Sequence, residues 1–310
     1  MKHIKHPLPY CKNFLLDSTN IETTFFSKKR VLLLVLYLFT LAIPNYSFAI
    51  PIISSNSHNE QKMSSRLSSF LDAQDSITPE MKEKAIQKVI DFNKDFKITP
   101  TNESKTLRRL FFAVQETFLT EYVLYSSFFQ TIDSGKYDCL TGSVLYAVFL
   151  EEIKQKGNFN YTYQIIQNPI HVFIKIKLSD NSEIIFESTS LEKGFIATPK
   201  GIAFYLQEQA NNVQKEVQNQ NVVLLDNKII NNLVTLETAS ALLYFNQGVL
   251  FFNQRKFGKS LLMAKNALFF QKNEAFYDLI ILSLQELLKN NLISEKEYDL
   301  NIKKCIVINN

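Results

Sequence analysis

The chain has 310 residues, of which 46% are hydrophobic, so it is long enough to bury the core of one large domain or two modest ones. Its formal net charge of +4 is accounted for by the first 49 residues, where six Lys or Arg residues outnumber two acids, and the remainder is close to neutral. A near-neutral surface without a basic stripe argues against nucleic acid as the partner.

The N-terminal segment has the pattern of a secretory signal peptide. Lys28, Lys29 and Arg30 precede an uncharged apolar run over residues 31–43, and small residues follow up to Ala49. The run is shorter than the roughly 20 apolar residues that a membrane span needs. We therefore expect cleavage near Ala49, export to the periplasm or the outside of a bacterial cell, and no membrane span in the mature protein. The alternative is a membrane anchor formed by residues 31–43.

Composition and periodicity divide the chain into five parts. The expected boundaries are 1–49 for the signal peptide, 50–98 for a polar, loosely packed arm followed by a helix, 99–206 for a domain of helices and strands, 207–228 for a linker or exposed helix rich in Gln and Asn, and 229–310 for a helical domain.

Within these parts, the apolar spacing predicts helices over residues 79–95 and 103–129, and a further helix that begins at Cys139 with Asp138 as its cap. The period then changes to that of strands, which are predicted over residues 159–165, 170–178 and 183–189. No strand is expected after residue 229.

The sequence around Cys139 reads GKYDCLTGSVLY, in which a polar turn gives way to a helix. A helix N-terminus favours the thiolate form of a cysteine, and its free N–H groups can hold an oxyanion. His171 is the only histidine in the part of the chain that reads as folded, and it opens the second predicted strand. A Cys/His pair needs a third group that orients the imidazole, and Glu187 on the next strand is the candidate.

The apolar pattern tests whether these two side chains meet. If the second and third strands form an antiparallel hairpin whose paired residue numbers sum to an even value, the apolar residues of one parity share a face and form a continuous core. The same register places His171 and Glu187 together on the opposite face, with a turn of three or five residues. We expect the helix that carries Cys139 to cover this second face, where Phe173 and Ile185 also lie.

A cysteine at a helix start, a histidine at a strand start and an acid on the following strand, in this order, resemble the transglutaminase-like superfamily of papain-related enzymes. The resemblance covers residues 103–200. It implies an α+β domain in which the cysteine-bearing helix packs on an antiparallel sheet, and a catalytic triad of Cys139, His171 and Glu187 without metal or cofactor. Two departures are the absence of tryptophan and Glu187 in place of the usual aspartate.

Two other side chains stay outside the predicted triad. Gln130 is a weaker candidate for an oxyanion donor, by analogy with papain-like enzymes. Cys305, near the polar C-terminus, is expected to be a bystander.

The C-terminal region is similar to a tetratricopeptide repeat, in which small residues let two antiparallel helices approach closely. Numbered from an aromatic at repeat position 4, the matching residues are Tyr244, Gly248, Phe251, Ser260 and Ala267. Only one repeat fits, and one unit cannot bury its own face. An ordinary helical hairpin is the alternative.

Together these patterns predict an exported, cysteine-dependent acyl-transfer enzyme that acts on a peptide or protein amide. The sequence does not decide between hydrolysis and crosslinking. The alternative is a transglutaminase-like scaffold without catalysis, whose C-terminal helices bind a partner protein. A thiol-reactive probe separates the two.

Overall fold

The fold is α+β, with a five-stranded antiparallel sheet among predominantly helical elements. The computed structural model describes residues 58–100, 102–219 and 232–309. The predicted signal peptide and its cleavage point lie outside these residues. Within the described ranges, no helix is long and apolar enough to span a membrane.

The sheet has the strand order β6-β5-β4-β3-β7, with every neighbouring pair antiparallel. Its strands are β3 (Thr162–Asn168), β4 (His171–Lys177), β5 (Glu183–Phe186), β6 (Phe195–Ile196) and β7 (Asn232–Val234). The three predicted strands are confirmed. The first begins and ends three residues later than predicted, and the third ends at Phe186 and not at residue 189. The expectation of no strand after residue 229 is wrong, because β7 pairs with the open edge of β3. A strand of three residues is too short to give a period-2 signal.

The register of the hairpin formed by β4 and β5 has the predicted parity. Ile174 pairs with Phe186 and Lys177 with Glu183, so the paired numbers sum to an even value and five residues form the turn. Alternation along the two strands then places His171 and Glu187 on the same face of the sheet. The hydrophobic pattern is sufficient to decide this, since any odd sum would divide the apolar residues between both faces.

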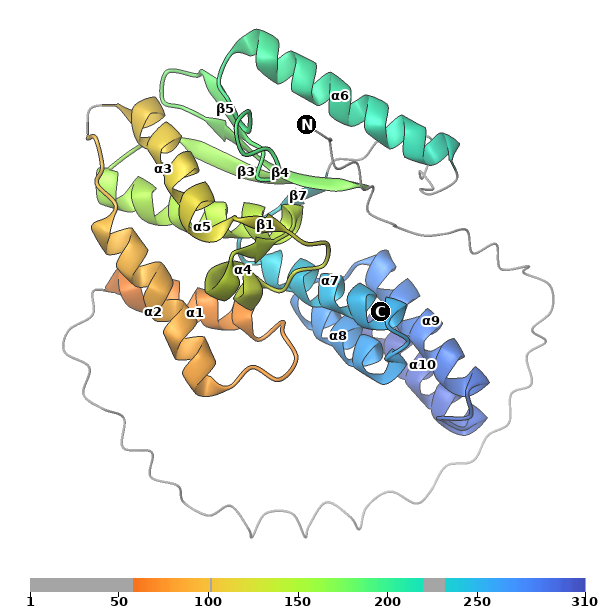
Figure 1. The fold of residues 1–310 in the computed structure, drawn as a ribbon. Coiled ribbons are helices and arrows are strands. Elements are labelled where there is room, and N and C mark those ends of the chain that lie inside the picture. Colours follow the sequence, from red (N-terminus) through yellow and green to blue (C-terminus); the bar gives the residue numbers. More distant parts are fainter. Residues whose placement is uncertain (1–57, 101, 220–231, 310) are drawn as a thin grey trace.

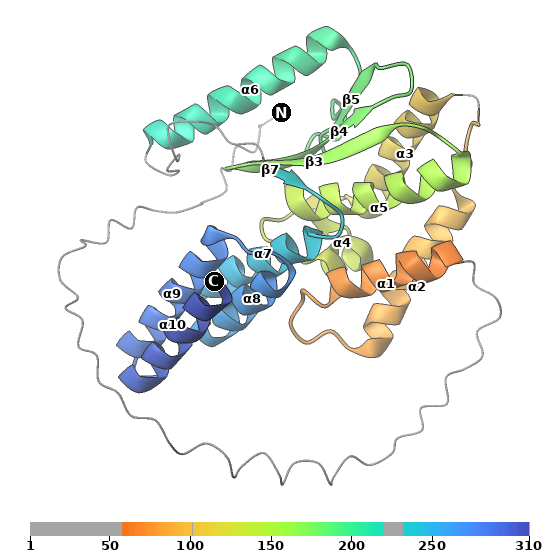
Figure 2. The same cartoon turned by 180° about the vertical axis from the view of Figure 1, so that it is seen from behind.

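Two helices cover the two faces of the sheet (Figures 1 and 2), and the expected assignment of one of them is wrong. α5 (Cys139–Gly157) packs on the face that carries Val172 and Ile174. The face with Phe173 and Ile185 is covered instead by α6 (Pro199–Gln218), through residues that include Ile202. The apolar residues of α6 are spaced so that they lie on one face of the helix. The many polar residues between and after them make the same segment look exposed in the sequence.

The single helix predicted over residues 103–129 is also wrong. The observed elements are α3 (Glu103–Phe118), β1 (Glu121–Tyr122), α4 (Phe128–Ser134) and β2 (Lys136–Tyr137). β1 pairs in parallel with β2, and the N–H groups of Thr120 and Glu121 both donate to the carbonyl oxygen of Gly135. Gly135 has φ of 76°, which ends α4 and turns the chain back toward Cys139. The apolar residues after Phe118 are spaced as in a helix, but pairing of β1 with β2 gives this segment a different structure.

The expectation of a loosely packed arm is wrong for residues 58–71. These form α1 (His58–Leu71), whose Met63, Leu67 and Phe70 are at most 1% exposed and belong to the main core. Their spacing is that of one face of a helix, surrounded by Ser, Asn and Gln that obscure it. The helix after it, α2 (Pro79–Asp95), has the predicted bounds, and Thr78 caps it: the Met81 N–H donates to Thr78 Oγ1.

The C-terminal helices form an antiparallel bundle that projects beside the sheet (Figure 1). They are α7 (Ala239–Asn253), α8 (Phe257–Phe270), α9 (Glu274–Lys289) and α10 (Glu295–Asn309). Small residues lie at the contacts: a Cβ at Gly248 would stand 3.0 Å from Leu279 Cδ2, and Ser283 Oγ donates to Ser260 Oγ at 2.9 Å. Gly248 and Ser260 thus lie where α7 and α8 contact α9, while the assignment of a repeat stays a prediction.

We expect Leu67→Ala to destabilise the protein by about 2–5 kcal/mol, because it leaves a cavity in the main core. Ser65→Ala, on the exposed side of the same helix, should stay within about 0.5 kcal/mol of the wild type. Urea unfolding measures both. A change below about 1 kcal/mol for Leu67→Ala would show that α1 is peripheral to the fold.

Candidate active site

Cys139 is the first residue of α5 and is 2% exposed. The predicted cap is confirmed: Asp138 Oδ1 accepts from the Thr141 N–H at 2.8 Å, and Thr141 Oγ1 accepts from the Asp138 N–H at 3.0 Å. This reciprocal capping box fixes where the helix begins. In the described part of the chain, the N–H of Cys139 has no hydrogen-bond partner, so it is free to bind an oxyanion.

His171 and Glu187 are in direct contact, at the end of the sheet where β4 begins and β5 has just ended. His171 Nε2 lies 2.6 Å from Glu187 Oε2, and the two side chains are 15% and 6% exposed. Since the carboxylate accepts, Nε2 carries the proton of this bond and Nδ1 is the ring nitrogen left for another partner. The structure therefore brings His171 and Glu187 together, as the predicted even register of the two strands requires.

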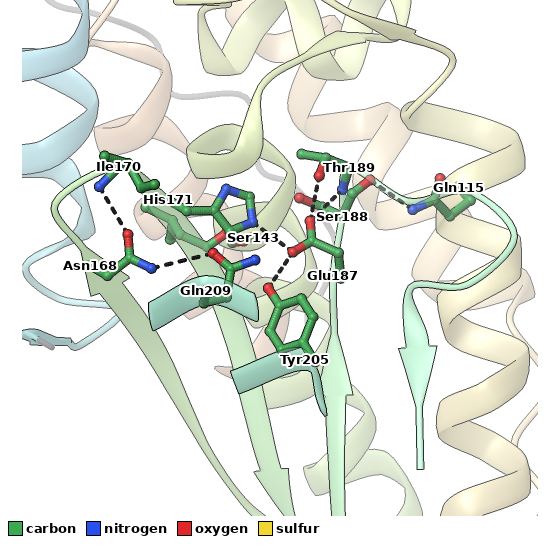
Figure 3. Close-up of polar contacts among 11 residues, drawn as sticks. Gln115, Ser143, Asn168, Ile170, His171, Glu187, Ser188, Thr189, Tyr205 and Gln209 are labelled. Atoms are coloured by element: carbon green, nitrogen blue, oxygen red, sulfur yellow. Dashed lines mark hydrogen bonds and ion pairs between the residues drawn. The ribbon is translucent and has the colours of Figure 1, made fainter. Parts of the chain in front are cut away.

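Glu187 is held at both carboxylate oxygens (Figure 3). Oε1 accepts from the Thr189 N–H at 2.8 Å and from Thr189 Oγ1 at 2.6 Å. Oε2 accepts from the Tyr205 hydroxyl of α6 in addition to His171. A buried carboxylate with this many donors has one orientation, so it can in turn fix the orientation of the imidazole.

The two pKa values move apart in opposite directions. Burial by itself raises the pKa of Glu187, but the charge and hydrogen bond of His171, together with Thr189 and Tyr205, outweigh it and hold the pKa below its ordinary value. Burial lowers the pKa of His171, but Glu187 and the neighbouring Cys139 raise it well above its ordinary value. A charged imidazolium beside a carboxylate is therefore favoured.

Cys139 and His171 meet at one small cavity. The Cys139 side chain is among the neighbours that raise the pKa of His171, so it lies close to the ring. Both residues line a cavity of about 20 Å³, which is enough for a water molecule. The cavity is lined by Asp138, Cys139, Leu140, Gln167, Asn168, His171, Val172, Leu242 and Asn246. All three predicted residues are thus assembled at one place, while their catalytic roles remain a prediction.

Two glycines permit the close packing behind the site. A Cβ at Gly142 would stand 2.9 Å from Ser188 Cβ, so a larger residue on α5 would push the helix away from the Glu187 segment. A Cβ at Gly194 would stand 2.1 Å from the Glu187 carbonyl oxygen, and the Glu187 N–H donates to the Gly194 carbonyl oxygen at 2.9 Å. Both positions therefore need glycine to keep the carboxylate in reach of His171.

Gln130 does not belong to the site. It is exposed, and its side chain completes the capping box of α4 by accepting from the Ser127 N–H at 2.9 Å. Tyr122 of β1 lies near the site instead: burial raises its pKa, and so do the charges of Cys139 and Asp138. Cys305, expected to be a bystander, belongs to α10.

Sequence reasoning missed several residues that shape the site. Tyr205, which holds Glu187 together with Thr189, carries no signal of its own in the sequence, because it lies in a stretch that reads as the approach to a linker. Asn246 carried a signal that could have found it, since Asn246 and Gln247 interrupt an otherwise apolar helix and are both buried. A buried amide in such a run needs a polar partner.

Comparison of the chain with protein-family models, with curated proteins and with solved structures gave no match. The described residues also contain no cluster of three or more His, Cys, Asp or Glu side chains that could hold a metal ion.

We expect Glu187→Gln to lower the pKa of His171 below that of the wild type, because burial then acts without the opposing carboxylate. Titration of the His171 ring followed by NMR measures this. Glu183→Gln is the matched control, since Glu183 forms a surface ion pair with Lys175 at 2.8 Å on the same hairpin. An unchanged His171 titration in Glu187→Gln would contradict the pairing.

The same variant should lose about 3–5 kcal/mol of folding stability at about pH 5.5, as expected when one partner of a buried pair is removed. The pKa of Glu187 is lowered from 4.5 and that of His171 is raised from 6.5, so the stabilisation is fully present between these values. It is lost as the pH falls through the folded-state pKa of Glu187 or rises through that of His171. Urea unfolding at several pH values should therefore show the largest difference from wild type near about pH 5.5, and a pH-independent difference would argue against an ion pair.

Proposed function

We propose that this protein is a cysteine-dependent acyl-transfer enzyme that acts on a peptide or protein amide. The observation that carries the proposal is the 2.6 Å contact of His171 with Glu187 at the same cavity as the first residue of α5, Cys139. A thiol at a helix start, an imidazole with one free nitrogen and a buried carboxylate that orients it are the parts that nucleophilic catalysis at a carbonyl requires.

The residues divide the reaction between them. In the resting site His171 Nδ1 holds the proton of the Cys139 thiol, which makes the imidazolium that Glu187 favours. The thiolate sulfur attacks the carbonyl carbon of the substrate amide. The N–H of Cys139 stabilises the resulting oxyanion. The His171 imidazolium then gives its proton to the amide nitrogen, the C–N bond breaks, and an amine leaves behind a thioester on Cys139.

The second half of the reaction regenerates the thiol. Water or an amine attacks the thioester carbonyl while His171 takes the proton of the attacking group, and the sulfur leaves and is reprotonated. Water gives hydrolysis and an amine gives a new amide, so the choice depends on which acceptor the site admits. Glu187 stays ionised throughout and holds the ring, as its low pKa requires.

The proposal includes the fold family of both parts of the chain. The order of the helix-borne thiol, the strand histidine and the following acid supports a transglutaminase-like domain, and the close contacts at Gly248 and Ser260 support a repeat-like C-terminal bundle. The apolar run at residues 31–43 supports export. A cavity of about 20 Å³ holds no peptide, so substrate binding requires the lining residues to move apart.

We expect Cys139 to react stoichiometrically with iodoacetamide at neutral pH, faster than free cysteine, because His171 withdraws its proton. His171→Ala should slow the reaction at least about tenfold, by the loss of that base. Intact-mass spectrometry with peptide mapping measures the rate and the position, with Cys139→Ser as the blank. Labelling no faster than free cysteine, unaffected by His171→Ala, would instead support the scaffold whose C-terminal helices bind a partner protein.

Activity itself is tested with a fluorescent primary amine and a glutamine-rich protein for transfer, and with a peptide library for hydrolysis. We expect either activity to fall at least about a thousandfold in Cys139→Ala, as for removal of a nucleophile. Glu187→Asp should retain more activity than Glu187→Gln, since it keeps the carboxylate. Equal activity in the two Glu187 variants would remove the carboxylate from the mechanism.

A further inference from the structure

The helical bundle reaches the start of the cysteine-bearing helix through one buried side chain. Asn246 of α7 donates from Nδ2 to Asp138 Oδ2 at 2.8 Å. Asn246 is 6% exposed and Asp138 is 1% exposed. The other oxygen of the same carboxylate accepts from the Thr141 N–H at 2.8 Å, so Asp138 connects α7 to the cap of α5.

The same face of α7 forms part of the cavity beside the thiol. Leu242 and Asn246, one helical turn apart, line it together with Cys139 and His171. The neighbouring Gln247 is also buried, but its Nε2 donates to the carbonyl oxygen of Tyr125 at 2.9 Å and not to the Asp138 carboxylate. Adjacent amides of α7 thus make two different contacts with the catalytic part.

Asp138 is an acid that needs its donors. Burial raises its pKa above the ordinary value, and hydrogen bonds from Thr141 and Asn246 reduce that rise without cancelling it. All of these groups donate, which suits the ionised carboxylate and not the protonated one. Without Asn246, Oδ2 would be buried with no donor, and taking up a proton would be its least costly response.

We propose that Asn246 is a positioning residue of the active site: it keeps the Asp138 carboxylate ionised and thereby sets the charge beside Cys139 at the start of α5. This inference rests on the proposed function and deepens it. It makes the C-terminal bundle a part of the catalytic unit, because a residue of α7 acts on the nucleophile through the cap of another helix.

Other titratable groups lie around Asp138 and Asn246 and also affect the titration of Cys139. His171 and Glu187 face the thiol from the sheet side, and tyrosines approach from the remaining elements. These tyrosines are Tyr122 of β1, Tyr125 before α4, Tyr137 of β2 and Tyr205 of α6. Burial raises the pKa of each above the ordinary value of about 10, so they stay neutral below about pH 9 and do not confuse a titration of Asp138 or Cys139.

The test is the far-ultraviolet absorbance of the Cys139 thiolate between about pH 4 and 9, taken as the difference from Cys139→Ser in the full chain. Asn246→Ala should let Asp138 become neutral, so the midpoint of the thiolate signal should move down by about half to one pH unit. Asn246→Asp should leave it near that of the wild type, since two buried carboxyls in contact share one proton and the pair keeps a single negative charge. Gln247→Ala and Gln247→Glu are the matched controls and should leave the midpoint within about 0.2 units.

A swap of the pair separates charge from packing. Asp138→Asn combined with Asn246→Asp keeps one carboxylate, and the amide introduced at position 138 can still cap α5 and donate to the carboxylate at position 246. The midpoint should return to that of the wild type. In the background of Asp138→Asn alone, Asn246→Ala should no longer move it. If either single variant fails to fold, the swap carries the test by itself.

The proposal is overturned if Asn246→Ala leaves the midpoint where it was, or if Asn246→Asp moves it down as far as Asn246→Ala does. It is also overturned if Asn246→Ala moves the midpoint equally without Asp138, or if the folded swap differs from wild type. Loss of thermal stability without a change of midpoint would show a packing role only. A wild-type midpoint equal to that of a free cysteine would contradict the proposed function, while the differences between variants would still decide the role of Asn246.

Discussion

The hydrogen bond between His171 Nε2 and Glu187 Oε2 is the interaction that the rest of the site depends on, since it leaves Nδ1 as the ring nitrogen available to another partner. Two buried, oppositely charged groups at 2.6 Å stabilise each other only if their remaining hydrogen-bonding atoms are also satisfied. Thr189 and Tyr205 fulfil that condition for the carboxylate. Cys139, the first residue of α5, lies at the same cavity as His171.

The elements around this bond converge on it from separate parts of the chain. The even register of β4 and β5 places both side chains on one face. α6 covers that face and contributes the Tyr205 hydroxyl, while α5 covers the other and presents Cys139 at the end of the sheet. Gly142 allows α5 to approach the Glu187 segment, so a helix, a hairpin and a loop meet at one cavity.

Sequence alone predicted the parts of this arrangement that local rules decide. The Asp138 cap, the start of α5 at Cys139 and the hairpin register each follow from a residue type or a period that spans a few residues. The rest depends on contacts between distant segments. Nothing local to residues 121–122 shows that they pair with β2, and the apolar spacing there is compatible with the helix that was expected. The apolar stripes of α1 and α6 were present in the sequence but were hidden by polar neighbours.

The predicted division of the chain into a domain of helices and strands and a separate helical domain does not describe how the candidate site is built. β7 joins the sheet immediately before α7, and Asn246 of α7 holds the acid that caps the cysteine-bearing helix. A ligand or partner that shifts the bundle would therefore shift the groups beside the thiol. The helical part is connected to the start of α5 by the hydrogen bond from Asn246 to Asp138.

The most direct test of the central claim is a crystal structure of the protein with a peptide aldehyde, which forms a reversible thiohemiacetal with an activated thiol. The account predicts a covalent bond from Cys139 Sγ to the aldehyde carbon, with the new oxygen on the Cys139 N–H and His171 still bonded to Glu187. An unmodified Cys139 at saturating aldehyde, or a His171 ring that has turned away from the sulfur in the complex, would contradict it.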